Sequence, residues 1–203
     1  MAAEVFGKLK SEILAYFQES SALLDGVIKD VALQKAIEDA CRLCIDAYKT
    51  NHKILIAGNG GSAADAQHFA GELVSRIYFD RSPLAAIALT TDTSILTAIG
   101  NDYGFNQIFS RQILANGLRG DIFFGICTSG NSENILRAAE VCQALGIKVI
   151  GLLGNQGGKM KDLCDVCIII PSISTPRIQE CHLIIEHIIC ALIEKSLFGG
   201  NNT

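Results

Sequence analysis

The sequence predicts an α/β fold: a three-layer sandwich in which helices cover both faces of a central parallel sheet. The expected strands are continuous apolar runs, such as residues 122–127, rather than alternating apolar and polar residues. Continuous runs are typical of strands that are buried on both faces. Segments with helical spacing lie between these runs, and strands that alternate with helices along the chain form parallel sheets.

The elements follow one another in a regular order. Apolar residues at helical spacing predict two helices, at residues 4–18 and 28–49, before the first strand. Strands are predicted at residues 53–57, 85–89, 122–127, 148–153 and 166–170. Further helices are predicted at residues 63–72, 93–99, 105–116, 132–145 and 158–163, with a long C-terminal helix over 177–197. No repeat or domain-sized linker interrupts the pattern, so residues 1–203 are expected to form a single domain.

Composition excludes several classes of protein. Hydrophobic residues make up 49% of the 203 residues and charged residues 19%, which indicates a large core. No apolar run reaches the roughly 20 residues that span a bilayer. The first eight residues lack the basic patch and apolar core of a signal peptide, so we expect a cytoplasmic protein without a membrane partner. The net charge of −4, without clustered Lys or Arg, predicts no binding to nucleic acid.

The eight cysteines include two C-x-x-C pairs, Cys41/Cys44 and Cys164/Cys167. Together they suggest a four-thiolate zinc site, but compact zinc modules separate such pairs by only about 15–20 residues. Cys41 and Cys44 also fall within a predicted helix. Because free cysteine often serves as a small core residue, we expect buried, reduced thiols.

A glycine-rich loop follows the first predicted strand. Gly58, Gly60 and Gly61 lead to Ser62, where a helix begins. A loop without Cβ atoms lets an anion approach the N–H groups at a helix N-terminus, which have no partner within the helix. Ser62 is expected to add a hydroxyl donor and to cap the helix. The loop is therefore predicted to bind phosphate.

The same residues also fit G-x-G-x-x-A, the fingerprint of a dinucleotide-binding domain. That fingerprint expects an acidic residue at the tip of the second strand, about 20 residues further on. Asp80 has roughly this spacing, but it precedes the second predicted strand instead of ending it. Two helices before the first strand also fit such a domain poorly, so a phosphate site is the better interpretation.

A second loop of this kind follows the strand at residues 122–127. Thr128, Ser129 and Ser132 offer three hydroxyls beside free N–H groups, which suits the oxygens of a phosphate. A capped helix with Ser132 at the N-cap would explain one serine but not the cluster. Neither serine cluster contains G-x-S-x-G, so a covalent serine mechanism is not expected.

Two polar pairs lie on largely apolar helices. His68 and Glu72 are four residues apart on one helix face, and Gln179 and His187 are about two turns apart on the terminal helix. Polar side chains in buried helices need partners. From the residues alone, two interpretations stay open: the four side chains surround a metal such as zinc, or they act directly as acid and base.

With these motifs the chain resembles the sedoheptulose 7-phosphate isomerases, or phosphoheptose isomerases, which have the sugar isomerase (SIS) fold. The resemblance covers nearly the whole chain. It is carried by Gly58–Ser62, His68–Leu73, Gly100–Phe105, Thr128–Ser132, Arg177–Glu180 and His187.

The resemblance implies a homotetramer with active sites at subunit contacts. It also implies conversion of D-sedoheptulose 7-phosphate to D-glycero-D-manno-heptose 7-phosphate, for bacterial surface heptose in lipopolysaccharide or capsule. The zinc ligands that it implies are His68, Glu72, Gln179 and His187, with Glu72 and His187 as the catalytic pair. The substrate contacts that it implies are Asn59, Gly60, Gly61, Ser62, Glu72, Asn101, Asp102, Cys127, Thr128, Ser129, Ser132 and Gln179. Cys127 stands where many relatives are expected to have serine, and the sequence leaves open whether its side chain or backbone contacts the substrate.

The chemistry that the resemblance implies agrees with these residue types. An aldose–ketose isomerisation moves a proton between C1 and C2 through an enediol, and it needs a base, an acid and a hold on the remote phosphate. Glu72 would take the carbon-bound proton and His187 would manage the oxygen-side proton. The alternative is a non-catalytic SIS-fold binding or regulatory protein. Such a protein would not need Glu72, Gln179 and His187 together.

Overall fold

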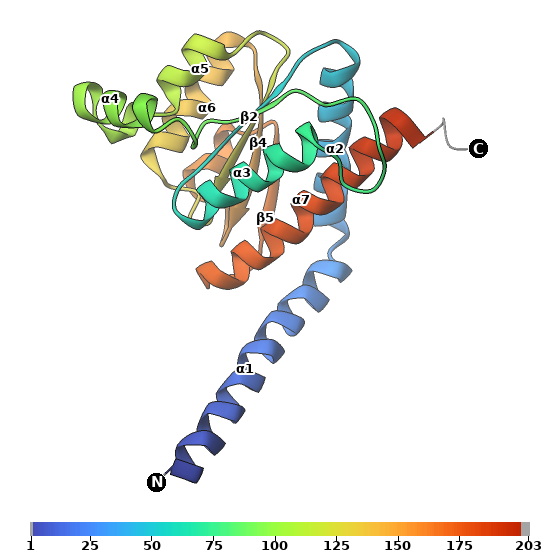
Figure 1. The fold of residues 1–203 in the computed structure, drawn as a ribbon, viewed down its shortest axis with the longest axis vertical. Helices are drawn as coiled ribbons and strands as arrows, with labels where there is room; N and C mark the ends of the chain where they lie inside the picture. The colour runs from blue at the N-terminus through green and yellow to red at the C-terminus, as the bar shows by residue number, and fades with distance from the viewer. Residues whose placement is uncertain (1, 200–203) are drawn as a thin grey trace.

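In the computed structural model, residues 2–199 are described, with the side chains of residues 2–5 and 7 left aside. Within this range the strands form one parallel sheet of five strands in the order β2-β1-β3-β4-β5. Helices cover both faces of the sheet, as Figure 1 shows. This arrangement confirms the predicted three-layer α/β fold. The prediction of a single domain extends over residues 1 and 200–203, which lie outside the described residues.

The three central strands of the sheet are buried almost throughout because they are apolar on both faces, whereas the two edge strands are only partly buried. The sheet consists of β1 (Ile54–Gly58), β2 (Ala86–Ala88), β3 (Ile122–Cys127), β4 (Lys148–Gly154) and β5 (Val166–Ile170). All residues of β1 and β3 are buried. In the parallel register of these two strands, Ile54 pairs with Ile122 and Gly58 with Ile126. The loops after β1 and β3 therefore leave the same edge of the sheet side by side.

Alternate residues of each strand supply two separate cores. In β1, Ile54 and Ile56 pack on the face covered by α2 (Val31–Lys49), α3 (Gly61–Val74) and α7 (Thr175–Phe198). Leu55 and Ala57 pack on the opposite face, against α5 (Ser110–Asn116) and α6 (Glu133–Leu145), with α4 (Thr93–Tyr103) at its border. This period of two is that of a strand with both faces buried.

The two N-terminal helices are confirmed, but they differ in their surroundings. Asp30 caps α2 by accepting a hydrogen bond from the Leu33 N–H, and α2 packs into the core. α1 (Ala2–Lys29) is longer than predicted and projects away from the sheet, as Figure 1 shows. Arg177 ties its C-terminal half to α7 by donating to the Tyr16 carbonyl at 2.9 Å. No helix among the described residues is both long and apolar enough to cross a membrane.

Two predicted helices take a different form. Residues 105–116 do not form one helix: a 3-10 turn, Phe105–Gln107, precedes α5, which begins at Ser110. The Ile108 N–H bonds to the carbonyl of Phe105, three residues back, and α5 starts anew from the carbonyl of Phe109. The intervening turn buries Ile108 and Phe109 together. Residues 158–163 likewise form a 3-10 helix, Gly158–Leu163.

The predicted burial of the cysteines holds for six of the eight, whereas Cys164 and Cys167 are only partly buried. All eight cysteines are free, and six of them, among them Cys41 and Cys44, are buried. Burial raises the pKa of the Cys41 thiol to about 11. Among the described residues the cysteines do not form a group with metal-ligand geometry.

Candidate active site

The backbone of the loop between β1 and α3 is accessible to an anion because two of its positions require glycine, which has no Cβ. Gly60 occupies the N-cap position of α3 at a φ of +56°, a left-handed conformation that favours glycine. A Cβ on Gly58 would lie 2.3 Å from the backbone oxygen of Ser62. The prediction that Ser62 caps this helix is wrong: α3 begins at Gly61, and Ser62 is buried within its first turn. The first N–H groups of α3 therefore have no side-chain cap.

The loop between β3 and α6 supplies the second set of donors. Ser132 stands at the N-cap position, as predicted, but its side chain makes no capping hydrogen bond. Its Oγ instead accepts from the Cys127 thiol at 3.2 Å, and the Ser129 Oγ lies 3.6 Å from the same sulfur. The N–H groups at the start of α6 and the Ser132 hydroxyl are thus available for a ligand.

The pKa of the Cys127 thiol indicates that this loop stabilises negative charge. Burial alone would raise this pKa. When the sulfur is ionised, hydrogen bonds to it from the Ser132 and Ser129 hydroxyls and from the backbone N–H groups of Ser132 and Asn131 outweigh the burial and lower the pKa below its usual value. Donors that stabilise a thiolate also stabilise the oxygens of a phosphate.

The two loops face a common cavity of about 300 Å³. Eight of the predicted substrate-binding residues line it, namely Asn59, Gly60, Gly61, Ser62, Cys127, Thr128, Ser132 and Gln179. Ile126 and Thr175 complete the wall. Ser129, which was also predicted to contact the substrate, is not among the residues that line this cavity; its Oγ accepts from the Asn131 N–H at 3.2 Å.

Asn59 reaches across to α6 and locks the two loops together. Its amide donates to the Asn134 Oδ1 at 3.0 Å and accepts from the Asn134 Nδ2 at 2.8 Å. This reciprocal pair uses one of the two donors and one of the two acceptor sites of the Asn59 amide and holds the amide in place beside the cavity. Sequence reasoning missed Asn134, because a buried Asn in the first turn of a helix carries no signal of a partner 75 residues away.

Gln179 joins the cavity from α7. A Cβ on Gly61 would lie 2.3 Å from the Gln179 Nε2, so the glycine is what lets this amide approach the start of α3. Seven residues further along α3, His68 meets His187 of α7. The two helices therefore run side by side in the same direction, with Gln179 at the end near the loops. The role of Gln179 as a metal ligand stays a prediction.

His68, Glu72 and His187 come together beyond the cavity on α3 and α7. The Nε2 atoms of the two histidines lie 2.7 Å apart, with their rings edge to face at 72°. The Glu72 Oε1 lies 3.7 Å from the His68 Nε2. The side chains of His68 and Glu72 are 41% and 25% exposed, so a ligand can reach them.

These three side chains form a group that could hold a metal ion. One ligand atom from each lies within 4.8 Å of the others. Two imidazole nitrogens and a carboxylate oxygen are ligands that transition metals accept. The predicted convergence of residues 68–72 with position 187 is thus present in the fold.

Beside this group lie buried polar atoms that the sequence analysis did not single out. Both carboxyl oxygens of Glu186 and the Nδ1 of His182 are buried without a hydrogen-bond partner among the described residues. Burial, with a smaller effect of the Asp65 carboxylate, raises the pKa of Glu186 to about 9. Burial lowers the pKa of His182 to about 4, and its Nε2 lies 3.0 Å from the Leu153 carbonyl oxygen. Both side chains are therefore neutral at pH 7.

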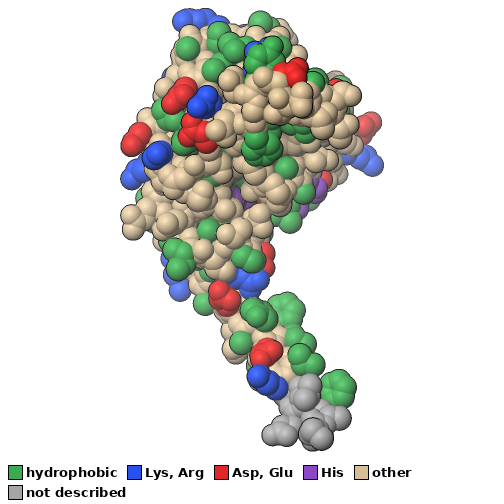
Figure 2. Space-filling model, turned by 90° about the vertical axis from the view of Figure 1, so that its left-hand side faces the viewer, with side chains coloured by type: hydrophobic (Ala, Val, Ile, Leu, Met, Phe, Trp, Pro, Cys, Tyr) green, Lys and Arg blue, Asp and Glu red, His purple; other side chains and the backbone are tan. Residues whose placement is uncertain are grey.

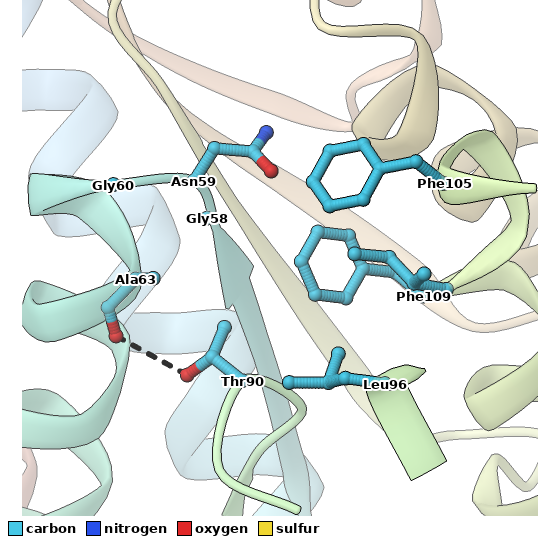
Figure 3. A pocket seen from close by; sticks show the side chains of 9 residues that line it. Gly58, Asn59, Gly60, Ala63, Thr90, Leu96, Phe105 and Phe109 are labelled. Atoms are coloured by element: carbon cyan, nitrogen blue, oxygen red, sulfur yellow. Dashed lines mark hydrogen bonds between the residues drawn. The ribbon is translucent and has the colours of Figure 1, made fainter. Parts of the chain in front are cut away.

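A second cavity, of about 170 Å³, adjoins the first and shares Asn59 and Gly60 with it. Figure 3 shows Leu96, Phe105 and Phe109 along its other wall, which is apolar. Asn101 and Asp102, predicted to contact the substrate, line neither cavity. They are exposed on α4, where the Asn101 amide donates to the Asp102 carboxylate at 2.8 Å. Their role stays a prediction.

Comparison with known proteins finds close relatives of this chain. The SIS domain profile matches residues 15–154, which include both anion loops, His68 and Glu72 but not α7. Phosphoheptose isomerase 2 of Campylobacter jejuni is 58% identical over 191 residues, which are 94% of this chain and 95% of that protein. Phosphoheptose isomerase of Aneurinibacillus thermoaerophilus is 57% identical over 92% of this chain and 94% of its own length. The solved structure of phosphoheptose isomerase from Neisseria gonorrhoeae has a TM-score of 0.86 and 42% identity, covering 92% of this chain and 99% of that one.

Proposed function

Since the chain belongs to the SIS-domain family and, within it, to the phosphoheptose isomerases, we propose that Glu72 and His187 catalyse its reaction. The protein is an isomerase of a phosphosugar. Its reaction interconverts D-sedoheptulose 7-phosphate and D-glycero-D-manno-heptose 7-phosphate through an enediol. The product serves the biosynthesis of bacterial surface heptose, in lipopolysaccharide or capsule.

One observation carries the assignment of residues. His187 on α7 meets His68 and Glu72 on α3, and the same two helices meet again at Gly61 and Gln179 beside the donor-rich cavity. A carboxylate and an imidazole thus lie along the same helix pair as the anion cradle. Side chains on a helix lean toward its N-terminus, which brings the Glu72 carboxylate toward that cradle.

The cradle binds the end of the substrate that does not react. Phosphate oxygens are expected to accept from the first N–H groups of α3 and α6 and from the hydroxyls of Thr128, Ser129 and Ser132. Gly60 and Gly61 leave room for the oxygens to approach the backbone. The remote phosphate then fixes C1 and C2 against Glu72 and His187, and this positioning supplies a large part of the rate.

The proton transfers follow from the two groups. From the ketose, the Glu72 carboxylate takes a proton from C1 while His187 donates a proton to the oxygen on C2, which gives the enediol. Glu72 then returns a proton to C2, and His187 accepts the proton of the hydroxyl on C1 as the aldehyde forms. Each group in such a pair is typically worth about 10²–10⁴-fold in rate.

We further propose that the metal is zinc, one ion per subunit. The side chains present fit it: His68 and His187 offer imidazole nitrogens, Glu72 a carboxylate oxygen, and Gln179 is the candidate for a fourth ligand. A bound zinc ion would polarise the carbonyl and stabilise negative charge on the enediolate oxygens.

A homotetramer with active sites at subunit contacts is also part of the proposal. α1 exposes a row of large apolar side chains, Phe6, Leu9, Ile13, Leu14 and Phe17, each 47% to 71% exposed. Figure 2 shows hydrophobic side chains along this projecting helix. An apolar hollow on the surface of α7 is a further candidate for a subunit contact. It is lined by His187 together with Tyr78, Ile184, Ile188 and Leu192. Exposed apolar surfaces such as the row on α1 and the hollow at His187 are typical of contacts between proteins. The hollow includes a residue of the proposed active site, His187. A cytoplasmic location stays a prediction.

The alternative, a non-catalytic SIS-fold binding protein, is tested by a coupled assay with sedoheptulose 7-phosphate. We expect turnover in the wild-type protein and loss of turnover, with retained sugar phosphate binding, in Glu72→Gln. Binding without turnover in the wild type would favour the alternative.

A further inference from the structure

A buried ion pair fastens the C-terminal end of α3 to α7. The Arg81 Nε lies 3.0 Å from the Glu194 Oε2, and the two side chains are only 1% and 0% exposed. The ring of Phe198 lies 5.7 Å from the centre of the guanidinium. Exposed ion pairs contribute little, but a buried pair that also makes hydrogen bonds fixes the geometry of the groups it touches.

Arg81 uses its remaining donors on the end of α3. Its Nη2 donates to the carbonyl of Glu72 at 3.0 Å, and its Nη1 donates to the carbonyl of Leu73 at 2.7 Å and of Ser82 at 3.1 Å. Carbonyls in the last turn of a helix have no partner within the helix. The guanidinium therefore acts as a C-terminal clamp on the turn that carries Glu72.

Glu194 uses its other contacts on the segment that follows α3. It accepts from the N–H of Ile77 at 3.0 Å and from the N–H of Tyr78 at 2.8 Å. Although burial alone would raise its pKa, these hydrogen bonds and Arg81 lower it, so the carboxylate stays ionised. Tyr78 shares an apolar hollow with His187. The network thus reaches the surroundings of both proposed catalytic residues.

We propose that Arg81 and Glu194 are positioning residues of the isomerase: they hold the last turn of α3 so that the Glu72 carboxylate stays against His68 and His187. This inference rests on the proposed function of Glu72. It predicts a division of labour along α3. The N-terminal end of the helix serves phosphate binding, and the clamped C-terminal end serves proton transfer.

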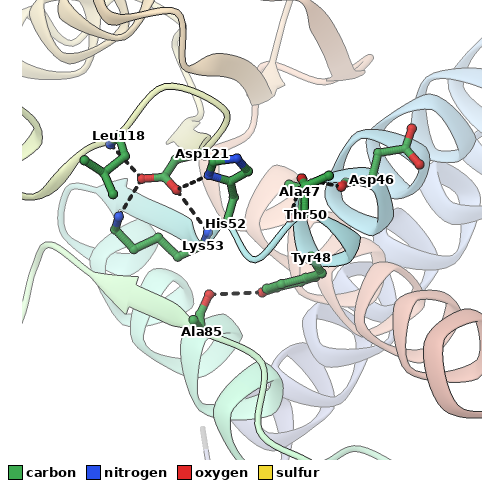
Figure 4. Close-up of polar contacts among 9 residues, drawn as sticks. All are labelled: Asp46, Ala47, Tyr48, Thr50, His52, Lys53, Ala85, Leu118 and Asp121. Atoms are coloured by element: carbon green, nitrogen blue, oxygen red, sulfur yellow. Dashed lines mark hydrogen bonds and ion pairs between the residues drawn. The ribbon is translucent and has the colours of Figure 1, made fainter.

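The chain offers a matched control in a second buried carboxylate, Asp121, which among the described residues makes no hydrogen bond or ion pair with α3 or α7. Asp121 is also fully buried, and it accepts from two backbone N–H groups, of Lys53 at 3.1 Å and Leu118 at 2.8 Å. Like Glu194 it is paired with a cation, here the Lys53 ammonium at 2.6 Å. Figure 4 shows this cluster, with His52 beside it. It lies where β1 and β3 begin, whereas the anion loops follow the ends of these strands.

The experiment compares Glu194→Gln, Arg81→Lys and Asp121→Asn with the wild type in three measurements: kcat and KM for sedoheptulose 7-phosphate, the affinity for inorganic phosphate, and the melting temperature. All three variants lose stability because each weakens a buried charge network. In Glu194→Gln and Arg81→Lys we expect kcat to fall by about 10- to 100-fold, since a small misplacement of a catalytic group has effects of that size. KM and the phosphate affinity should change less than about twofold, because the cradle lies at the other end of α3.

Asp121→Asn should lose stability while kcat stays within about twofold of the wild type, because the polar partners of the Asp121 carboxylate are Lys53, Leu118 and His52 and not residues of α3 or α7. Values of kcat are compared only for variants that remain folded at the assay temperature. The positioning role is overturned if Glu194→Gln and Arg81→Lys keep the wild-type kcat. It is also overturned if kcat falls in all three variants, Asp121→Asn included, in proportion to the fall in melting temperature. A wild-type protein without isomerase activity would instead overturn the proposed function. Arg81→Lys keeps a positive charge beside Glu194 and serves as the second variant should Glu194→Gln fail to fold.

Discussion

The Nε2 atoms of His68 and His187 lie 2.7 Å apart although the two residues are 119 positions apart in the sequence. Two imidazole nitrogens at this distance either share one proton or turn toward a common ion. Glu72 reaches the same place from the next turn of α3. The contact brings a possible base, a possible acid and a ligand set for a metal to one point along the helix pair.

Removal of the metal tests the ligand set. We expect the purified protein to contain about one zinc ion per subunit, and His68→Ala and His187→Ala to lose most of it, because each removes one of the two imidazole ligands of the proposed site. Elemental analysis before and after dialysis against a chelator measures this. Full zinc content in both variants would contradict the assignment of ligands.

Ser132→Ala separates binding from capping. Removing an N-cap side chain usually costs about 1 kcal/mol. Since the Ser132 hydroxyl makes no capping bond, the free energy of unfolding should change by less than about 0.5 kcal/mol. KM for the sugar phosphate should rise with kcat nearly unchanged, because the phosphate is held alike in the ground and transition states. Steady-state kinetics and urea unfolding give both numbers, and the same KM effect is expected for Ser129→Ala. A large fall in kcat at unchanged KM would contradict this role.

Asn134→Ala tests the link between the two anion loops. The variant removes both hydrogen bonds of this pair, and because the half-buried Asn59 amide can bond to water instead, the loss is about 0.5–1.5 kcal/mol. We expect a loss of stability of this size and a weaker affinity for inorganic phosphate, measured by calorimetry. Unchanged phosphate affinity would mean that the loops keep their places without the amide pair.

His182 should make the protein sensitive to acid. Its pKa in the folded state is about 4, below the ordinary value of 6.5, because burial disfavours the imidazolium. Folding therefore favours the neutral ring. The stability that this contributes is present above pH 6.5 and is lost as the pH falls to about 4. The loss amounts to about 3 kcal/mol.

The check is the difference between wild type and His182→Gln in free energy of unfolding, measured from pH 7 to pH 4. The variant lacks the titrating ring, so it should lose about 3 kcal/mol less than the wild type over this interval. Parallel curves for the two proteins would contradict the inference. Carboxylates that titrate in the same range affect both proteins alike and cancel in the difference.

Local patterns predicted most of the fold. The β-strands are continuous apolar runs apart from Lys148 at the start of β4, and α3 and α6 follow loops whose glycines and serines mark a helix start. The failures came where the chain departs from local rules. Ser62 has the residue type of a cap, yet α3 begins one residue earlier because Gly60 adopts the left-handed conformation. The helix expected over residues 105–116 is interrupted so that Ile108 and Phe109 are both buried.

The candidate site was predictable as two separate halves. Each anion loop was visible as a local motif, and His68 and Glu72 as a helical pair. Their meeting with His187 came from the resemblance to a family, because spacing alone cannot pair α3 with α7. Asn134, Arg81 and Glu194 went unnoticed for the same reason. Asn134 pairs with a residue 75 positions away and Arg81 with Glu194 113 positions away, and each of the three would by itself be taken for an ordinary polar residue.

The central claim is that Glu72 moves the carbon-bound proton, and isomerisation in D₂O tests it most directly. In the wild type, solvent deuterium should enter the product at C2, because the proton removed by a carboxylate exchanges with solvent before it is returned. Glu72→Gln should bind the sugar phosphate with near-native affinity and incorporate deuterium at least about 100-fold more slowly. Glu140→Gln, at an exposed glutamate about two turns further along α6 than the anion loop, serves as the control and should behave as the wild type. Incorporation by Glu72→Gln at the wild-type rate would contradict the account.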